Sequence, residues 1–115
     1  MDTLRITPEN VPAEAYRPPP DRVLAGAPDQ TIVDAYGSPD GKFSAGFWTG
    51  APGRWRVAYS EHELCHLLAG EVALHGDDGS VATYRAGDSF VVPAGFTGVW
   101  EVVTAARKLY AIYQP

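Results

Sequence analysis

Cysteine, methionine and lysine are all scarce in this chain. The 115 residues contain one cysteine, Cys65, and one methionine, and only two of the nine basic residues are lysines. A lone cysteine excludes an internal disulfide and any zinc site built entirely from cysteines. With 14 acidic residues the net charge is -5, a balance that repels phosphate backbones and argues against nucleic-acid binding.

Long apolar stretches are also missing. The longest stretch without a charge runs from Ser89 to Trp100 and is interrupted by Pro93. A membrane helix needs ~20 consecutive apolar residues, so we expect no membrane association. The first residues carry no basic start followed by an apolar stretch, and this predicts a cytoplasmic protein in a reducing compartment. The length is typical of a single domain.

Proline is concentrated at the beginning of the chain. Six of the ten prolines lie in residues 1–30, including Pro18, Pro19 and Pro20. Proline fixes φ and removes a hydrogen-bond donor, so residues 1–30 are predicted to form an extended arm. Scattered apolar residues in this arm would anchor it either to its own domain or to a second subunit.

Residues 31–115 show the pattern of a β-barrel domain. Short segments rich in Val, Ile, Tyr, Phe and Trp alternate with glycine, proline and aspartate. The expected strands are 31–36, 43–49, 54–60, 63–68, 71–75, 81–84, 89–92, 98–103 and 107–113. With no convincing helical segment, the pattern predicts an all-β sandwich or barrel.

Two motifs resemble those of the cupin superfamily of small jelly-roll barrels. Glu63 and Gly70 have the spacing of the first cupin motif, and Gly87, Pro93 and Gly95 have that of the second. The segments 53–57, 63–70 and 96–101 further resemble the branch that contains the (S)-ureidoglycine aminohydrolase cupin domain. The resemblance implies a cupin jelly roll that binds a small molecule.

The resemblance also implies a metal position, and this chain departs from it. Most cupins hold one divalent ion through two histidines, a glutamate and a further histidine, and these positions correspond here to Val57, Tyr59, Glu63 and Gly98. Only Glu63 is an ordinary ligand, so no cofactor and no metal are predicted. A rewired metal site remains an alternative, built from His62, His66 and Cys65 or from Glu61, Glu63 and Cys65.

Period-two counting predicts what lines the barrel instead. If Tyr59 and Glu63 point inward, Trp55, Val57 and Cys65 share their face. Gly98 shares a face with Trp100 and is expected to open volume beside it, while either Phe47 or Trp48 faces the lumen and Tyr110 comes from the last strand. The result is an aromatic pocket for a small polar ligand. The alternative is that the tryptophans serve only to pack the core.

The function remains open between three hypotheses. Glu63 and Tyr59 are candidate acid–base catalytic residues if no cation neutralises Glu63, because a buried carboxylate needs a partner or a raised pKa. Arg54, Arg56 and Arg107 are candidate partners, although their parity favours the outer face. The alternatives are a non-catalytic binding module and a metal-dependent, aminohydrolase-like cupin. A homodimer is expected, since the barrel leaves edges and an apolar face to cover.

Overall fold

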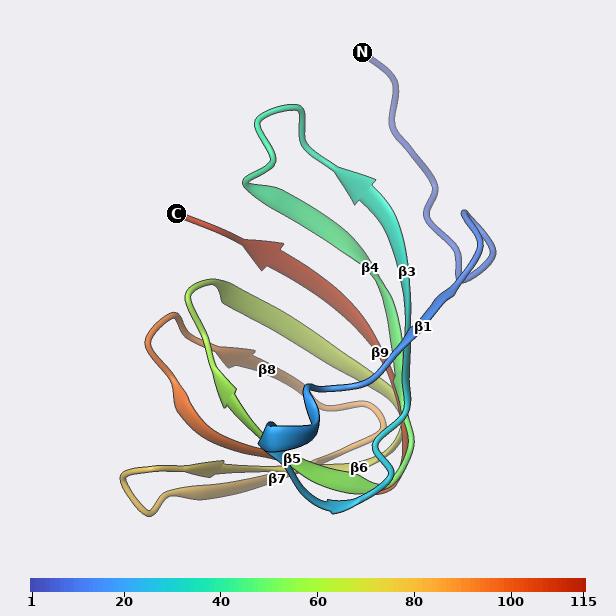
Figure 1. Cartoon of the computed structure of the whole chain (residues 1–115). Coiled ribbons are helices and arrows are strands. Elements are labelled where there is room, and N and C mark those ends of the chain that lie inside the picture. Colours follow the sequence, from blue (N-terminus) through green and yellow to red (C-terminus); the bar gives the residue numbers. More distant parts are fainter.

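The computed structural model describes residues 1–115 as one antiparallel sheet of nine strands that curls into a half-barrel (Figure 1). The strands are β1 (Glu14–Tyr16), β2 (Val23–Gly26), β3 (Gln30–Gly37), β4 (Phe43–Gly50), β5 (Gly53–Ala58), β6 (His62–Gly76), β7 (Val81–Arg85), β8 (Ser89–Val92) and β9 (Thr97–Tyr113), with a single 3-10 turn, η1 (Pro20–Arg22). The all-β prediction is confirmed. No helix in the structure has the length and apolarity needed to cross a bilayer.

The sheet is built around two long strands, β6 and β9. The main path runs β1-β3-β4-β9-β5-β2, and β6 adds to it by pairing with β7, β8 and β9. The sequence predicted each long strand as two short ones, and this division was wrong. The register of β6 against β9 shifts between Leu67 and Val72 without breaking the pairing. Gly70 has a φ of +86°, so it forms a bulge that bends a continuous strand.

Residue alternation along β6 determines which side chains face the inside of the curl. Glu63, Cys65 and Leu67 are buried, whereas Leu64 is half exposed on the outer face. The sequence could not decide whether Glu61 or Glu63 points inward. In the structure Glu63 is 5% exposed within the curl, and Glu61 lies before the strand.

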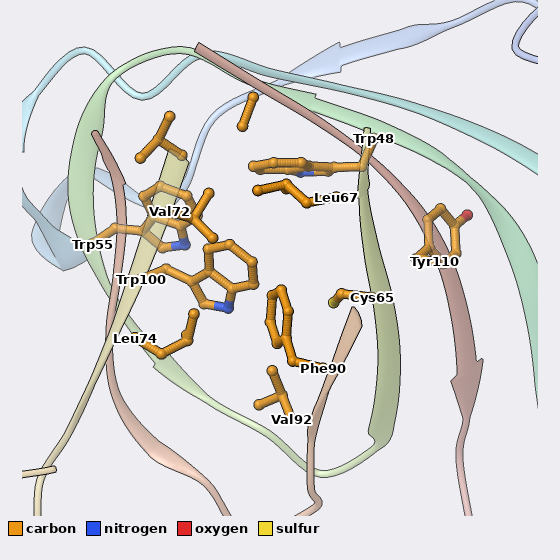
Figure 2. Packing of buried hydrophobic residues seen from close by; sticks show 12 residues of the cluster. Trp48, Trp55, Cys65, Leu67, Val72, Leu74, Phe90, Val92, Trp100 and Tyr110 are labelled. Carbon is orange, nitrogen blue, oxygen red and sulfur yellow. The ribbon is translucent and has the colours of Figure 1, made fainter. Parts of the chain in front are cut away.

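The core is aromatic and lies on the concave side of the sheet (Figure 2). Trp100, which is 2% exposed, stacks on Trp55 at a centroid distance of 6.1 Å, and Trp48 packs against both rings. Phe90 closes the cluster from β8. Aromatic side chains bury large areas and add favourable ring contacts, so this cluster provides much of the packing of a small barrel.

The proline-rich N-terminal stretch connects the two edges of the main path. β1 pairs with β3 at one edge, and β2 pairs with β5 at the other. Residues 16–22, from the last residue of β1 to the residue before β2, are called the strap below and cross the open side of the curl (Figure 1). Pro18 of the strap is buried. Of the expected arm, residues 14–16 and 23–26 thus form strands that pair with the sheet of their own chain.

Candidate functional site

The centre of the concave side holds a buried ion pair. The Lys108 ammonium lies 2.8 Å from Glu63 Oε2, and both side chains are 6% exposed. The two residues come from the neighbouring strands β9 and β6, whose register places Lys108 opposite Leu67 and Ile112 opposite Glu63. A buried carboxylate is costly without a partner, and the ammonium supplies that partner.

Lys108 also contacts two of the core tryptophans. Its Nζ lies 4.6 Å from the ring centroid of Trp48 and 4.4 Å from that of Trp100. Cations are attracted to the negative faces of aromatic rings at such distances. Burial, the largest single influence, lowers the pKa of Lys108, but the charge of Glu63, the hydrogen bond to it and the nearby Cys65 and Tyr16 together outweigh burial, so the net direction is upward. Lys108 is therefore a permanent cation at neutral pH.

Tyr59 completes the environment of Glu63. The Tyr59 hydroxyl donates to Glu63 Oε1 at 2.7 Å and accepts a hydrogen bond from Trp100 Nε1 at 2.9 Å. Backbone hydrogen bonds to Phe96 and Gly95 fix Tyr59 just beyond the end of β5. Burial and the neighbouring Glu63 raise the pKa of Tyr59 well above its usual range. The phenol therefore keeps its proton and acts as a donor.

The partner of Glu63 was not among the residues that the sequence analysis proposed. Arg54, Arg56 and Arg107 were candidates, and none of them pairs with Glu63. Arg107 is exposed, and Arg56 binds Asp77 at 2.8 Å at the protein surface. The sequence did contain evidence for Lys108. Side chains alternate along a strand, so the pattern that directs Tyr110 inward also directs Lys108, two residues earlier, to the same face.

Trp48, which contacts Lys108, forms a second group of hydrogen bonds. Trp48 Nε1 donates to Gln30 Oε1 at 2.8 Å and to the Tyr16 hydroxyl at 3.0 Å. Gln30 is 6% exposed at the start of β3, and Tyr16 belongs to the strap. The sequence analysis assigned neither residue to the site. No periodicity marks them, since their position depends on how the strap crosses the sheet.

These groups border a cavity of about 390 Å³ that opens beneath the strap. Of the predicted site residues, those that line it are Trp48, Trp55, Val57, Tyr59, Glu63, Trp100 and Tyr110. Glu61 and Ile112, which alternation also suggests, line it as well. Residues that the sequence analysis did not propose for the pocket also line it: Tyr16, Pro18, Pro19, Arg22, Gln30, Ile32, Arg56, Ala58 and Lys108. The walls are thus mainly apolar, with a few charged and hydroxyl groups.

Cys65 and Gly98 do not line the cavity. Cys65 is fully buried in the core, where burial, together with the nearby Glu63, raises the pKa of its thiol to about 12. The expectation that Gly98 opens volume beside Trp100 was wrong. A Cβ at Gly98 would lie 2.0 Å from the carbonyl oxygen of His75, so the glycine instead allows β9 to approach β6 closely.

Tyr110 lines the cavity with its ring and uses its hydroxyl elsewhere. The hydroxyl donates to Asp34 Oδ1 on β3 at 2.8 Å. Figure 2 shows the Tyr110 oxygen directed away from the tryptophan cluster. Burial, followed by the hydrogen bond to Asp34, raises the pKa of this phenol.

The residues present do not fit a metal ion of the usual cupin kind. Val57 has no donor atom, Gly98 is confined between strands, and the Glu63 carboxylate is already neutralised by Lys108. No three His, Cys, Asp or Glu side chains cluster anywhere in the chain so as to hold an ion.

The two alternative ligand sets are likewise not assembled. His62 and His66 lie on the outer side of β6, where His62 accepts the Ala94 N–H and His66 pairs with Ser89. Glu61, Glu63 and Cys65 do not converge on one point either. No chemistry is therefore assigned to a metal at this site.

The jelly-roll half-barrel with a small-molecule-sized cavity defines the chain as a cupin-type domain. Residues 37–110 match the model of the EutQ-like cupin domain, and the chain belongs to that family. A search of curated proteins finds no match to the sequence.

Solved structures show the same fold. A protein of unknown function from Pseudomonas syringae pv. tomato is 25% identical with a TM-score of 0.79, over 89% of this chain and 44% of that one. The EutQ protein of Clostridium difficile is 16% identical with a TM-score of 0.67, over 76% and 64%. A Thermotoga maritima protein, a predicted oxalate decarboxylase, is 16% identical with a TM-score of 0.72, over 97% and 100%. The chain thus spans less than two thirds of the first two proteins.

Proposed function

We propose that this protein binds a small polar metabolite in the cavity beneath the strap, without a metal ion. The observation that carries the proposal is the open cavity of about 390 Å³, lined in part by Trp48, Trp55 and Trp100. Small-molecule sites commonly have this size range, apolar walls and a few convergent polar groups. The resemblance to the ureidoglycine aminohydrolase branch adds small, nitrogen-containing metabolites to the compounds worth testing.

Binding without turnover is favoured over acid–base catalysis by the state of Glu63. Each of its oxygens already has a partner, Tyr59 at Oε1 and Lys108 at Oε2. A carboxylate held this way presents no free oxygen to a ligand, whereas a general acid or base must reach the proton that it transfers. The catalytic hypothesis assumed that no cation neutralises Glu63, and in the structure Lys108 does so.

A metal-independent enzyme remains a second candidate because the Tyr59–Glu63 hydrogen bond itself borders the cavity. Glu63→Gln separates the two functions once a ligand is found. Retained binding with loss of a chemical conversion would favour catalysis. Retained binding with no conversion by either protein favours a binding module.

The test of the proposal is a metabolite screen with a variant that fills the cavity. Val57→Phe adds a ring to the cavity wall, whereas Val91→Phe makes the same change on the exposed face of β8. Purified proteins would be incubated with a metabolite extract and analysed by native mass spectrometry. We expect a ligand on the wild type and on Val91→Phe, and none on Val57→Phe. Equal retention by Val57→Phe, or no ligand on the wild type, would contradict the proposal.

We also propose that the protein is a homodimer through the outer face of the sheet. Leu64 of β6 pairs across the strands with Val91 of β8, and these side chains are 50% and 59% exposed. Leu68 and Tyr113, also on the outer side, are 41% and 49% exposed. Contiguous apolar residues on a sheet face are typical of an interface, and a two-fold axis lets one such face cover its copy.

A further inference from the structure

Most polar groups around the cavity already have hydrogen-bond partners within the protein. Trp100 donates to Tyr59, Tyr59 donates to Glu63, and Lys108 neutralises Glu63 while facing two tryptophan rings. The charges of this buried pair cancel. A ligand therefore has little to gain from the floor of the cavity beyond apolar contact, and its polar recognition must come from groups that are still free.

The free donors are on the strap. The Tyr16 hydroxyl accepts a hydrogen bond from Trp48, which leaves its own hydrogen available to a ligand. Burial raises the pKa of Tyr16, so this hydroxyl stays protonated. Arg22, in η1, lines the same cavity with a guanidinium that has no acidic partner. By contrast, Arg56 of the neighbouring strand β5 also lines the cavity but is held by both oxygens of Asp77.

One free acceptor lines the same cavity. Glu61 lines the cavity and makes no ion pair with Arg22 or Arg56. A guanidinium presents several N–H donors in a planar fork that fits the two oxygens of a carboxylate, and a tyrosine hydroxyl can supplement it. The strap offers two donors, Arg22 and Tyr16, to the carboxylate of a ligand. A cationic ligand would meet only one carboxylate, Glu61, so an anionic ligand is the better match.

We infer that the ligand is a small organic anion whose carboxylate is bound by Arg22 and Tyr16 of the strap. Its apolar part packs against Trp55 and the neighbouring cavity wall. The inference rests on the proposed function, because it names the ligand class of the same cavity. It gives the strap a role in recognition beyond covering the sheet, and it assigns to Glu61 the role of repelling anions.

Three probes of matched shape and different charge test the inference. They are cyclohexanecarboxylate, cyclohexanecarboxamide and cyclohexylmethylammonium, titrated into the full chain by calorimetry. We expect the carboxylate to bind roughly tenfold more tightly than the amide, a difference that a charge-assisted hydrogen bond can supply. Arg22→Gln and Tyr16→Phe should each weaken carboxylate binding more than amide binding, because the amide carbonyl accepts the same hydrogen bonds without a charge. Glu61→Gln should strengthen it.

Arg17→Gln is the matched control. Arg17 is also an exposed arginine of the strap, but it pairs with Asp29 and does not line this cavity. Its substitution should leave all three affinities unchanged. Equal effects of Arg17→Gln and Arg22→Gln would show a general charge effect and overturn the inference.

The probes also separate this inference from the proposed function. Amide binding that Val57→Phe abolishes supports the cavity as a binding site whatever the charge preference. If the ammonium probe binds best and Glu61→Gln weakens it, the site selects cations and only the inference is overturned. Equal affinities for all three probes overturn it too. If no probe binds the wild type at ~10 mM, weaker than any useful metabolite affinity, both proposals are contradicted.

Discussion

The ammonium of Lys108 lies 2.8 Å from the Glu63 carboxylate in the interior of the half-barrel. Glu63 occupies the position at which the resemblance to cupins implies a metal ligand, and here a lysine from the neighbouring strand provides the positive charge. This positive charge belongs to a side chain of the protein, and the Lys108 Nζ lies over the rings of Trp48 and Trp100. The protein's own Lys108 therefore neutralises the buried Glu63 carboxylate.

Removing the ammonium should destabilise the protein strongly. Lys108→Met keeps the length of the side chain but leaves Glu63 buried and unpaired, and such a change costs about 3–5 kcal/mol. The double variant Lys108→Met/Glu63→Gln should recover a large part of that loss, because no uncompensated charge remains. Urea denaturation measures both. Lys42→Met is the control, since Lys42, the other lysine, is exposed. An equally small effect of both methionine substitutions would contradict the assigned pairing.

Loss of the Tyr59 hydroxyl should break the hydrogen-bond chain at its centre. Tyr59→Phe leaves Trp100 Nε1 without an acceptor and removes a donor from Glu63. We expect a loss of about 1–3 kcal/mol in the free energy of unfolding, the cost of a buried polar group left unsatisfied. Tryptophan emission should shift at the same time. Tyr113→Phe, on an exposed tyrosine, should change neither quantity.

Cys65 should be unreactive while the protein is folded. Burial raises the pKa of its thiol from 9.0 to about 12, and the thiolate is the reactive form. At pH 8 a disulfide reagent should modify Cys65 only as fast as the chain opens, so the rate should rise with urea in parallel with unfolding. Rapid modification of native protein in the absence of urea would show that the thiol is accessible.

The raised pKa of the Cys65 thiol also predicts how the free energy of unfolding depends on pH. A group with a raised pKa in the folded state contributes its stability below its unfolded pKa and loses it as pH rises toward the folded value. For Cys65 this window extends from 9.0 to about 12, so unfolding should become easier across it. Cys65→Ala should lower stability at pH 7 by leaving a cavity, yet show a shallower decline above pH 9. Identical slopes for the two proteins would contradict this assignment.

A charge on the outer face should prevent the proposed dimer. Leu64→Lys places an ammonium in the middle of the exposed apolar face, and light scattering coupled to size-exclusion chromatography should then report a monomer. Val81→Lys, at an equally exposed valine on β7, should leave the dimer intact. A monomeric wild type at micromolar concentration would refute the dimer.

Much of the fold was determined by the sequence itself. Short alternating segments, glycines at turns and the two cupin-like motifs were enough to predict an all-β jelly roll. Alternation also predicted that Trp100 faces inward, although it left open whether Glu61 or Glu63 does, and it could have identified Lys108 by its relation to Tyr110. These features are local, because the side-chain direction along a strand repeats every two residues whatever the strand pairs with.

Contacts between distant segments were decided only by the tertiary structure. The partner of Glu63 depends on the register of β6 against β9, which shifts at the bulge around Gly70 and is not encoded in any two-residue period. The consequence of glycine at position 98 depends on how closely the backbone of His75 approaches. Likewise, Tyr16 and Arg22 reach the cavity only because β1 and β2 join opposite edges of the sheet and draw the strap across it.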